Sequence, residues 1–174
     1  MEKIIQTCGQ QLKNDGWRLV ILTITRVPDV IDNDQVIASG FRCLKLIVNH
    51  YIDKLSQENF ITILGAIHKY ASNDGENVNN NLTAINMFQN IADYTAKLTI
   101  REGSQVNTLR IWSMLFDKIQ ELGTDYRTEL RNTNIRTMEQ ILMTHGPLLS
   151  GEVWTSLLKG SLLHMLRYSM DMFI

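Results

Sequence analysis

The sequence predicts an all-α protein, a HEAT/armadillo-like solenoid of about four antiparallel helical hairpins. Apolar residues recur at helical spacing along nearly the whole chain, and no segment shows the two-residue alternation of a half-buried strand. Pairing the predicted helices gives hairpins that begin near Trp17, Ser56, Ser104 and Ser150, at intervals of 39, 48 and 46 residues. HEAT and armadillo repeats recur every ~40–47 residues. A closed helical bundle of the same length has similar intervals and remains the alternative.

Length and composition lead us to expect one domain, residues 1–174. The chain has 174 residues, of which 44% are hydrophobic and 20% charged, as in ordinary folded proteins. A chain of this length buries roughly 70% of its unfolded surface without disulfides or metals. Residues 172–174 form an apolar finish, where natural termini are usually polar. We therefore expect a fragment of a longer solenoid, with Met1 added as initiator and apolar surface at both ends.

The first two helices are expected on either side of a polar break. The first is predicted over residues 2–13, and the break is Asn14-Asp15-Gly16. The second is predicted over residues 17–26, with one apolar face formed by Trp17, Val20, Ile21 and Ile24. Pro28 has no N–H to donate in a helix interior, so we expect the second helix to stop before it.

The third and fourth helices begin at good capping residues. Asp34 is the predicted N-cap of a helix that reaches about residue 53, and Ser56 begins a helix that reaches about Ser72. Their apolar stripes are Ile37, Phe41, Leu44, Val48, Tyr51 and Ile52, and Phe60, Ile63, Leu64 and Ile67. The polar run SNDGENVNNN then predicts an exposed loop, in which residues 72–80 are either disordered or a contact site. The triplet Asn81-Leu82-Thr83 is expected to cap a helix.

Four more helices are predicted in the second half of the chain. The fifth covers residues 80–100, the sixth is capped by Ser104 and closed by Gly123, and the seventh begins after Asp125 and ends at Gly146-Pro147. The eighth runs from Ser150 to the end of the chain. The residues expected to face a core are Leu82, Ile85, Phe88, Ile91 and Thr95; Leu109, Trp112, Leu115, Phe116, Ile119 and Leu122; and Leu130, Ile135, Met138, Ile141 and Leu142.

Charge and hydropathy exclude two classes of partner. The formal net charge is −1 and no basic tract stands out, so the sequence predicts no nucleic-acid binding. The longest apolar run, residues 19–24, is far shorter than the ~20 residues that span a bilayer, so no transmembrane segment is expected.

No catalytic or metal-binding pattern is found. His50, His68, His145 and His164 lie on four different predicted helices without ligand partners at helical spacing. The two cysteines, Cys8 and Cys43, are expected to be reduced, buried thiols. The sequence therefore predicts a protein that is not an enzyme and has no cofactor.

The charged stretch at the start of the seventh helix predicts a structural lock. Asp125 is expected to accept backbone N–H groups as N-cap, and Glu129 suits the positive end of the helix dipole. Arg127 and Arg131 are expected to reach carboxylates or carbonyls in a neighbouring repeat. These charges would then fix the register between hairpins.

Three blocks of sequence carry a resemblance to a known family. They are Asp125, Arg127, Glu129, Leu130, Arg131 and Asn132 with Thr-His-Gly-Pro-Leu-Leu-Ser up to Trp154; NNLTAI through NIADY, which includes Asn90 and Asp93; and FRCLKLIV from Phe41 to Val48. In their order along the chain they resemble the helical region downstream of the catalytic domain in the large BIG- and GBF-type Arf exchange factors and, more closely, their non-catalytic relative, the monensin-sensitivity scaffold. Gln89 stands where that family has tryptophan, and Asn134 where it has a small residue.

The resemblance implies a non-enzymatic scaffold segment in Golgi and endosome vesicle trafficking. The residues expected to form a structural, inter-repeat motif are Asp125, Arg127, Glu129, Arg131 and Asn132, with Asn90 and Asp93. The alternative that the resemblance leaves open is a regulatory helical domain in a large Arf guanine-nucleotide exchange factor. Partners implied by the family are a dopey-type protein, an Arf-like GTPase and an aminophospholipid flippase. The implied location is cytoplasmic, peripheral on Golgi, trans-Golgi and endosome membranes, with at most a weak contact to the membrane surface.

Overall fold

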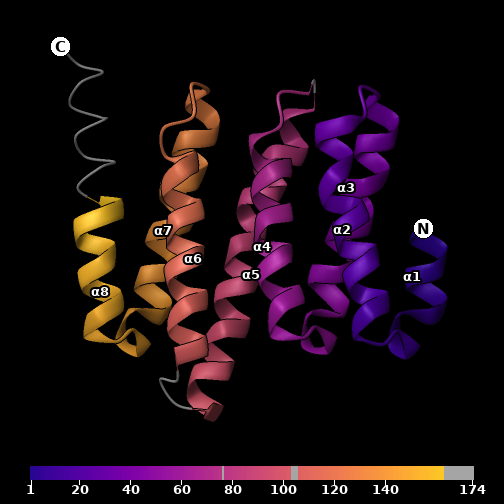
Figure 1. The fold of residues 1–174 in the computed structure, drawn as a ribbon. Coiled ribbons are helices and arrows are strands. Elements are labelled where there is room, and N and C mark those ends of the chain that lie inside the picture. Colours follow the sequence, from indigo (N-terminus) through magenta and orange to yellow (C-terminus); the bar gives the residue numbers. More distant parts are fainter. Residues whose placement is uncertain (76, 103–105, 163–174) are drawn as a thin grey trace. The chain divides into compact units, whose positions relative to one another are not determined.

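The computed structural model describes residues 1–75, 77–102 and 106–162, and in these residues the chain is all-α. Eight α-helices follow one another there, with short 3₁₀ and π segments and no strand (Figure 1). The chain divides into two compact units, Met1–Asn90 and a second that starts at Ile91. The predicted all-α class and the order of consecutive helices, as in a helical solenoid, are confirmed, whereas the HEAT or armadillo type of the repeat stays a prediction.

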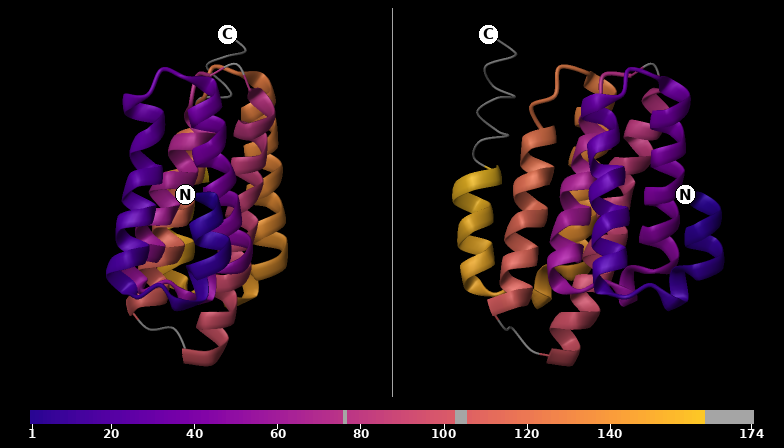
Figure 2. Two further views of the ribbon diagram at one scale, coloured as in Figure 1. Left: turned by 90° about the vertical axis from the view of Figure 1, so that its right-hand side faces the viewer. Right: turned by 45° about the vertical axis from the view of Figure 1, so that its right-hand side comes forward.

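The first unit contains α1 to α4 and the start of α5. The helices are α1 (Glu2–Cys8), α2 (Asn14–Val30), α3 (Asp34–His50), α4 (Gln57–Ser72) and α5 (Val78–Glu102). Helices α2, α3 and α4 contact one another and run side by side in both views of Figure 2. Their facing stripes are almost completely buried and include Trp17, Ile21, Ile24, Phe41, Leu44, Ile47, Val48, Phe60, Ile63, Leu64 and Ile67.

The start of α2 differs from the prediction. The helix begins at Asn14, so Asn14-Asp15-Gly16 forms its first turn, and the chain is extended one residue earlier at Lys13. Asp15 suits the positive end of the helix dipole there. The amide of Asn59, at the start of α4, donates to the backbone oxygen and the side-chain oxygen of Asn14, both at 3.0 Å. A tertiary contact therefore holds a turn that local sequence preference predicts as a break.

The predicted stop at Pro28 is also wrong, because α2 continues through this proline to Val30. Pro28 has no N–H for the carbonyl of Ile24, four residues earlier, and an unpaired buried carbonyl is costly. The hydroxyl of Tyr70 on α4 donates to that carbonyl at 3.2 Å. Gly40 on α3 makes room for it, since a Cβ at this position would lie 2.2 Å from the Tyr70 oxygen. A side chain on another helix thus supplies the donor that proline lacks.

The caps of α3 and α4 are only partly as predicted. Asn33, not Asp34, is the N-cap of α3, and its side chain accepts from the N–H groups of Gln35 and Val36. Helix α3 ends at His50, short of the predicted residue 53, and a 3₁₀ turn follows at Ile52–Lys54. Ser56 caps α4 as predicted, accepting from the N–H of Asn59.

Asn81 joins the end of α4 to the start of α5. The sequence predicts an exposed polar run up to this residue and a helix that begins near residue 80. Asn81 does lie in the first turns of α5, but it is only 3% exposed. Its side-chain nitrogen lies 2.9, 3.1 and 2.8 Å from the carbonyl oxygens of Tyr70, Ala71 and Asn73. The expected capping role is therefore played at the C-terminus of α4, whose last carbonyls have no partner within their own helix.

The second unit contains the rest of α5 and the helices that follow it. These are α6 (Val106–Leu122), α7 (Thr128–His145) and α8 (Gly151–Leu157), with a 3₁₀ turn at Gly146–Leu148 and a π segment at Leu158–Leu162. Gly123 closes α6 and Ser150 caps α8, both as predicted. The predicted cap Ser104, the end of the eighth helix and His164 lie outside the described residues.

The buried stripe of α7 contains polar residues that the sequence analysis did not include. Asn134 is fully buried and donates to the backbone oxygen of Ile119 on α6 at 2.6 Å. Ile135, predicted to face the core, is 44% exposed. The predicted apolar spacing is wrong here because a buried asparagine and Thr137 occupy core positions in place of aliphatic residues.

The two cysteines have different environments. Cys43 on α3 is 3% exposed, and burial raises the pKa of its thiol. Cys8 at the end of α1 is exposed, which contradicts the expectation that both thiols are buried. Both are free thiols, as expected.

Candidate functional site

The turn before α7 holds the charged residues that the sequence predicts as a lock. The carboxylate of Asp125 accepts from the backbone N–H of Arg127 at 2.9 Å and from its guanidinium at 3.0 and 2.8 Å. Asp125 does not occupy the N-cap position, which belongs to Arg127. The side chains of both residues are mostly buried, at 9% and 14% exposure. Asp125 therefore braces the turn two residues before the helix begins.

Electrostatics in this turn favour the charged carboxylate. Burial raises the pKa of Asp125, but hydrogen bonds from Arg127 and the charges of Arg127 and Arg131 outweigh it and hold the pKa below its ordinary value. Arg131 donates to the backbone oxygens of Asp125 and Tyr126 at 2.7 and 2.9 Å, and to the hydroxyl of Thr128. These bonds of Arg131 close the turn on itself. A bond from it to a neighbouring repeat stays a prediction.

The other residues of the predicted motif are spread over both units. Glu129 lies exposed in the first turn of α7, where the helix dipole favours it, and Asn132 is exposed one turn later. Asn90 on α5 donates to the side-chain oxygen of Asn49 on α3 at 3.0 Å, within the first unit. The structure thus places the motif at several separate contacts.

Asp93 meets the histidine of the predicted His-Gly-Pro block. The Nε2 atom of His145, at the end of α7, lies 2.7 Å from Oδ1 of Asp93 on α5. His145 is 9% exposed and its ring lies against that of Trp112 on α6, with centroids 6.0 Å apart. The indole of Trp112 in turn donates to the hydroxyl of Thr99 on α5 at 3.2 Å. Three helices of the second unit are therefore linked by polar contacts through one histidine and one tryptophan.

The end of the same block is fixed to α8. The indole N–H of Trp154 donates to the backbone oxygen of Gly146 at 3.2 Å. A Cβ at Gly146 would lie 3.2 Å from the Trp154 ring, so a glycine allows this close approach. This part of the block thus ties the turn after α7 to α8.

Two kinds of site, a metal centre and a membrane-spanning helix, concern the residues that the structure describes. There, no three His, Cys, Asp or Glu side chains are grouped so that they could hold a metal ion. Over the same part of the chain, no helix is long and apolar enough to cross a membrane.

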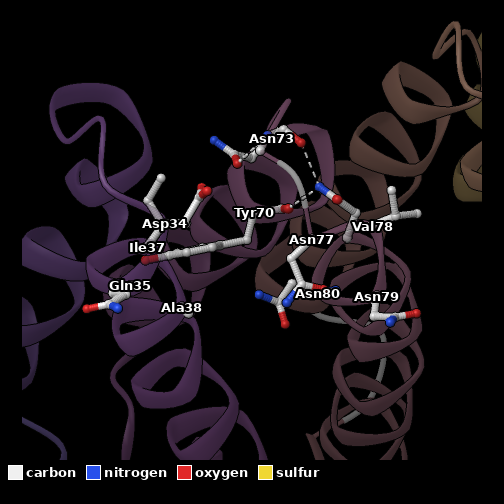
Figure 3. A pocket seen from close by; sticks show the side chains of 12 residues that line it. Asp34, Gln35, Ile37, Ala38, Tyr70, Asn73, Asn77, Val78, Asn79 and Asn80 are labelled. Atoms are coloured by element: carbon white, nitrogen blue, oxygen red, sulfur yellow. Dashed lines mark hydrogen bonds between the residues drawn. The ribbon is translucent and has the colours of Figure 1, made fainter.

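A hollow lies in the first unit, at the end where α2 meets α3 and α4 meets α5 (Figure 3). It has a volume of about 540 Å³. One wall is the first turn of α3, with Asp34, Gln35, Ile37 and Ala38. The opposite wall is the α4–α5 loop and the asparagine-rich first turn of α5, and the ring of Tyr70 lies between the two. The loop that the sequence analysis left open is therefore, in its described residues, part of a concave surface.

A second hollow of about 420 Å³ adjoins the first. Its wall is the α2–α3 link, with Pro28, Asp29, Val30, Ile31 and Asp32. The sequence analysis missed both hollows, because the capping residues of α3 and the asparagines of α5 are far apart in sequence. The signals that it did contain were the unusual density of asparagine in residues 77–81 and of aspartate in residues 29–34.

Comparisons with known proteins point to one group of relatives. The chain is 26% identical to the MON2 homologue of Drosophila melanogaster over 172 residues, which is 89% of this chain and 10% of that protein. It is 25% identical to the human homologue over 94% of this chain, and 26% identical to that of Xenopus laevis over 87%. No family model and no solved structure matches the chain. Over most of its length the chain is therefore MON2-like in sequence, and it spans about a tenth of the length of the relatives that it matches.

Proposed function

We propose that this chain is a non-enzymatic protein-interaction segment of a scaffold that acts in Golgi and endosome vesicle trafficking. The observation that carries the proposal is the similarity to MON2 homologues, which extends over 87–94% of the chain. It agrees with the three sequence blocks that resemble the monensin-sensitivity scaffold. Similarity spread over the whole chain supports a shared role for the segment better than a single matched motif would.

The use of polar side chains supports a scaffold over an enzyme. Asp125, Arg127, Asp93 and His145 are engaged with one another or with backbone, in contacts that hold helix ends. A catalytic group needs a polar side chain directed at a substrate-sized space. The charged pairs of the block therefore favour a structural role, in which they hold helices in fixed register beneath a binding surface.

The segment is proposed to act as a single helical domain within a longer HEAT- or armadillo-like solenoid. In such an array each hairpin is stabilised by its neighbours, and binding surfaces run along the stack. The proposed role of Asp125, Arg127, Glu129, Arg131 and Asn132, with Asn90 and Asp93, is to set the register between repeats. The proposed partners are those of the resembled family: a dopey-type protein, an Arf-like GTPase and an aminophospholipid flippase, met at Golgi and endosome membranes from the cytoplasmic side.

Cross-linking mass spectrometry on the full-length parent protein in cell extracts tests this proposal. We expect cross-links from the exposed lysines of this segment, such as Lys45, Lys54 and Lys97, to a trafficking protein. A parent protein that carries a catalytic exchange domain, and whose rate of nucleotide exchange on an Arf-family GTPase changes when this segment is deleted, would replace the scaffold role with the regulatory one. Cross-links confined to proteins without any trafficking role would refute both.

A further inference from the structure

The two hollows at the loop end of the first unit form one continuous surface. Both are lined by Asp34, Ile37, Asn73 and Gly75, so these four residues belong to both hollows. We call this surface the loop groove. A Cβ at Gly75 would lie 3.5 Å from the carboxylate of Asp34, which places the α4–α5 loop directly against the start of α3.

The charge of the loop groove has a single sign. Its lining residues include Asp29, Asp32, Asp34 and Asp74, and no lysine, arginine or histidine. Asp29 forms an ion pair with Lys69 outside the lining. Asp32 and Asp34 are exposed, and the structure gives their side chains no hydrogen bond or ion pair with any described residue. Two carboxylates are thus available to a cation, and the concave walls concentrate their field.

The apolar part of the groove lies beside these carboxylates. Ile37 and Ala38 are half-buried on its α3 side, and Val30 and Ile31 are 70% and 36% exposed on its α2 side. Lysine and arginine place their aliphatic stems along apolar surface and keep their charged heads near polar groups. A strip of aliphatic side chains that ends at carboxylates therefore fits a basic side chain better than a free cation.

The remaining wall consists of side-chain amides. Asn77, Asn79 and Asn80 line the groove on its α5 side, and each carries both a hydrogen-bond donor and an acceptor. An extended peptide offers the complementary pattern, one N–H and one carbonyl for every residue. The amide of Asn81 is engaged with the end of α4, so it holds the wall in place and does not serve the groove.

We propose that the loop groove binds an extended peptide segment of a partner protein. A lysine or arginine side chain of the peptide forms ion pairs with Asp32 and Asp34, and the peptide main chain forms hydrogen bonds with the asparagine side-chain amides. The proposal rests on the role of the chain as a protein-binding segment and names a surface and a partner chemistry for it.

Binding of a defined peptide to the 174-residue chain tests the proposal. The probe is an eight-residue fluorescent peptide of alternating serine and arginine, and its control has glutamate in place of arginine. We expect the arginine peptide to bind and the glutamate peptide not to bind. Each of Asp32→Asn and Asp34→Asn is expected to weaken binding roughly two- to fivefold, as for exposed ion pairs. The matched control Asp15→Asn removes an exposed aspartate at the opposite end of α2 and is expected to leave binding unchanged.

Amide chemical shifts locate the bound peptide. In the labelled chain we expect the side-chain NH₂ signals of Asn77, Asn79 and Asn80 to move on titration, and that of the exposed Asn132 on α7 to stay. Equal weakening by Asp15→Asn, equal binding of both peptides, or shifts that avoid the three asparagines would overturn the proposal. Full displacement by an equal charge of spermine would also overturn it, because a bare polyamine has no main chain to recognise. These measurements need no trafficking partner, so their failure is distinct from failure of the cross-linking test.

Discussion

The substitution Tyr70→Phe tests whether a side chain on α4 replaces the backbone donor that Pro28 lacks. In the wild-type chain the Tyr70 hydroxyl donates to the Ile24 carbonyl at 3.2 Å, and both residues are almost fully buried. Without the hydroxyl this carbonyl has neither a helical N–H nor a side-chain donor. Leaving a buried polar group unsatisfied costs about 1–3 kcal/mol, so we expect the free energy of unfolding to fall by this amount.

A double-mutant cycle separates this mechanism from a loss of packing. Pro28→Ala restores an N–H at position 28, which can donate to Ile24 within the helix. In the Pro28→Ala background we therefore expect Tyr70→Phe to cost less than about 1 kcal/mol, because the carbonyl already has a partner. Urea unfolding followed by far-UV circular dichroism gives the four free energies. Equal costs of Tyr70→Phe in both backgrounds would refute the reasoning.

The stability of wild type and Tyr70→Phe at alkaline pH is a second test of the buried hydroxyl. Burial is the main cause that raises the pKa of Tyr70 well above its ordinary value of 10.0. The contribution of Tyr70 to the free energy of unfolding is therefore complete below pH ~10. It is lost as pH rises further, since the Tyr70 hydroxyl ionises at lower pH in the unfolded chain than in the folded one. We expect wild type to lose more stability than Tyr70→Phe between pH ~9 and pH ~11. Parallel curves for the two proteins would show that the hydroxyl is not buried as described.

Three further predictions concern a close contact, a helix link and a charged turn. Gly40→Ala should destabilise the first unit by about 1–3 kcal/mol because its Cβ would lie 2.2 Å from the Tyr70 oxygen. Gly65→Ala should stabilise it by about 0.5–1 kcal/mol, because beyond the adjacent residues and the backbone of its own helix a Cβ there meets nothing within 4 Å; thermal unfolding of both variants compares them. Asn81→Asp should cost more than Asn81→Ala in urea, because it places a carboxylate where an amide nitrogen lies 2.8–3.1 Å from three carbonyls. Asp125→Asn should cost stability at pH 7 but little near pH 2, because the depressed pKa of Asp125 adds stability that is present above its ordinary value of 3.8 and lost as pH falls through its folded value; a cost that does not change with pH would contradict this.

The sequence predicted those helix boundaries that local chemistry determines. Ser56 and Ser150 cap helices because a serine side chain can accept from the first free N–H groups whatever surrounds it. Gly123 closes α6 for an equally local reason. The all-α class followed from apolar spacing, which a strand cannot satisfy.

The predictions that failed depend on partners distant in the chain. Pro28 remains inside a helix only because Tyr70, on another helix, reaches the carbonyl that it leaves open. Asn134 occupies a core position because the Ile119 carbonyl accepts from it, which moved Ile135 to the surface. Periodicity assigns an asparagine to the outside and an isoleucine to the inside, and it contains no information on an acceptor fifteen residues away in the chain.

The candidate groove was out of reach of sequence reasoning for a similar reason. Asp34 and the asparagines of α5 become neighbours only when α3 and α4 have packed. The sequence did show an asparagine-rich segment, but it did not determine whether this segment is disordered or a contact site. What it lacked was the opposite wall, which decides whether such a segment is a solvated loop or one side of a binding surface.

The side-chain amide of Asn81 makes the placement of the α4 and α5 ends independent of the length of the loop between them, although these two properties are usually coupled. It fastens the first turn of α5 to the last carbonyls of α4, so the relative placement of these two helix ends does not depend on the length of chain between them. Insertions after Asp74 would lengthen the connection at little entropic cost and leave the helices where they are. Sequence changes in this loop can therefore alter the rim of the groove, and with it the peptide that the groove is proposed to bind, while the positions of α4 and α5 stay the same.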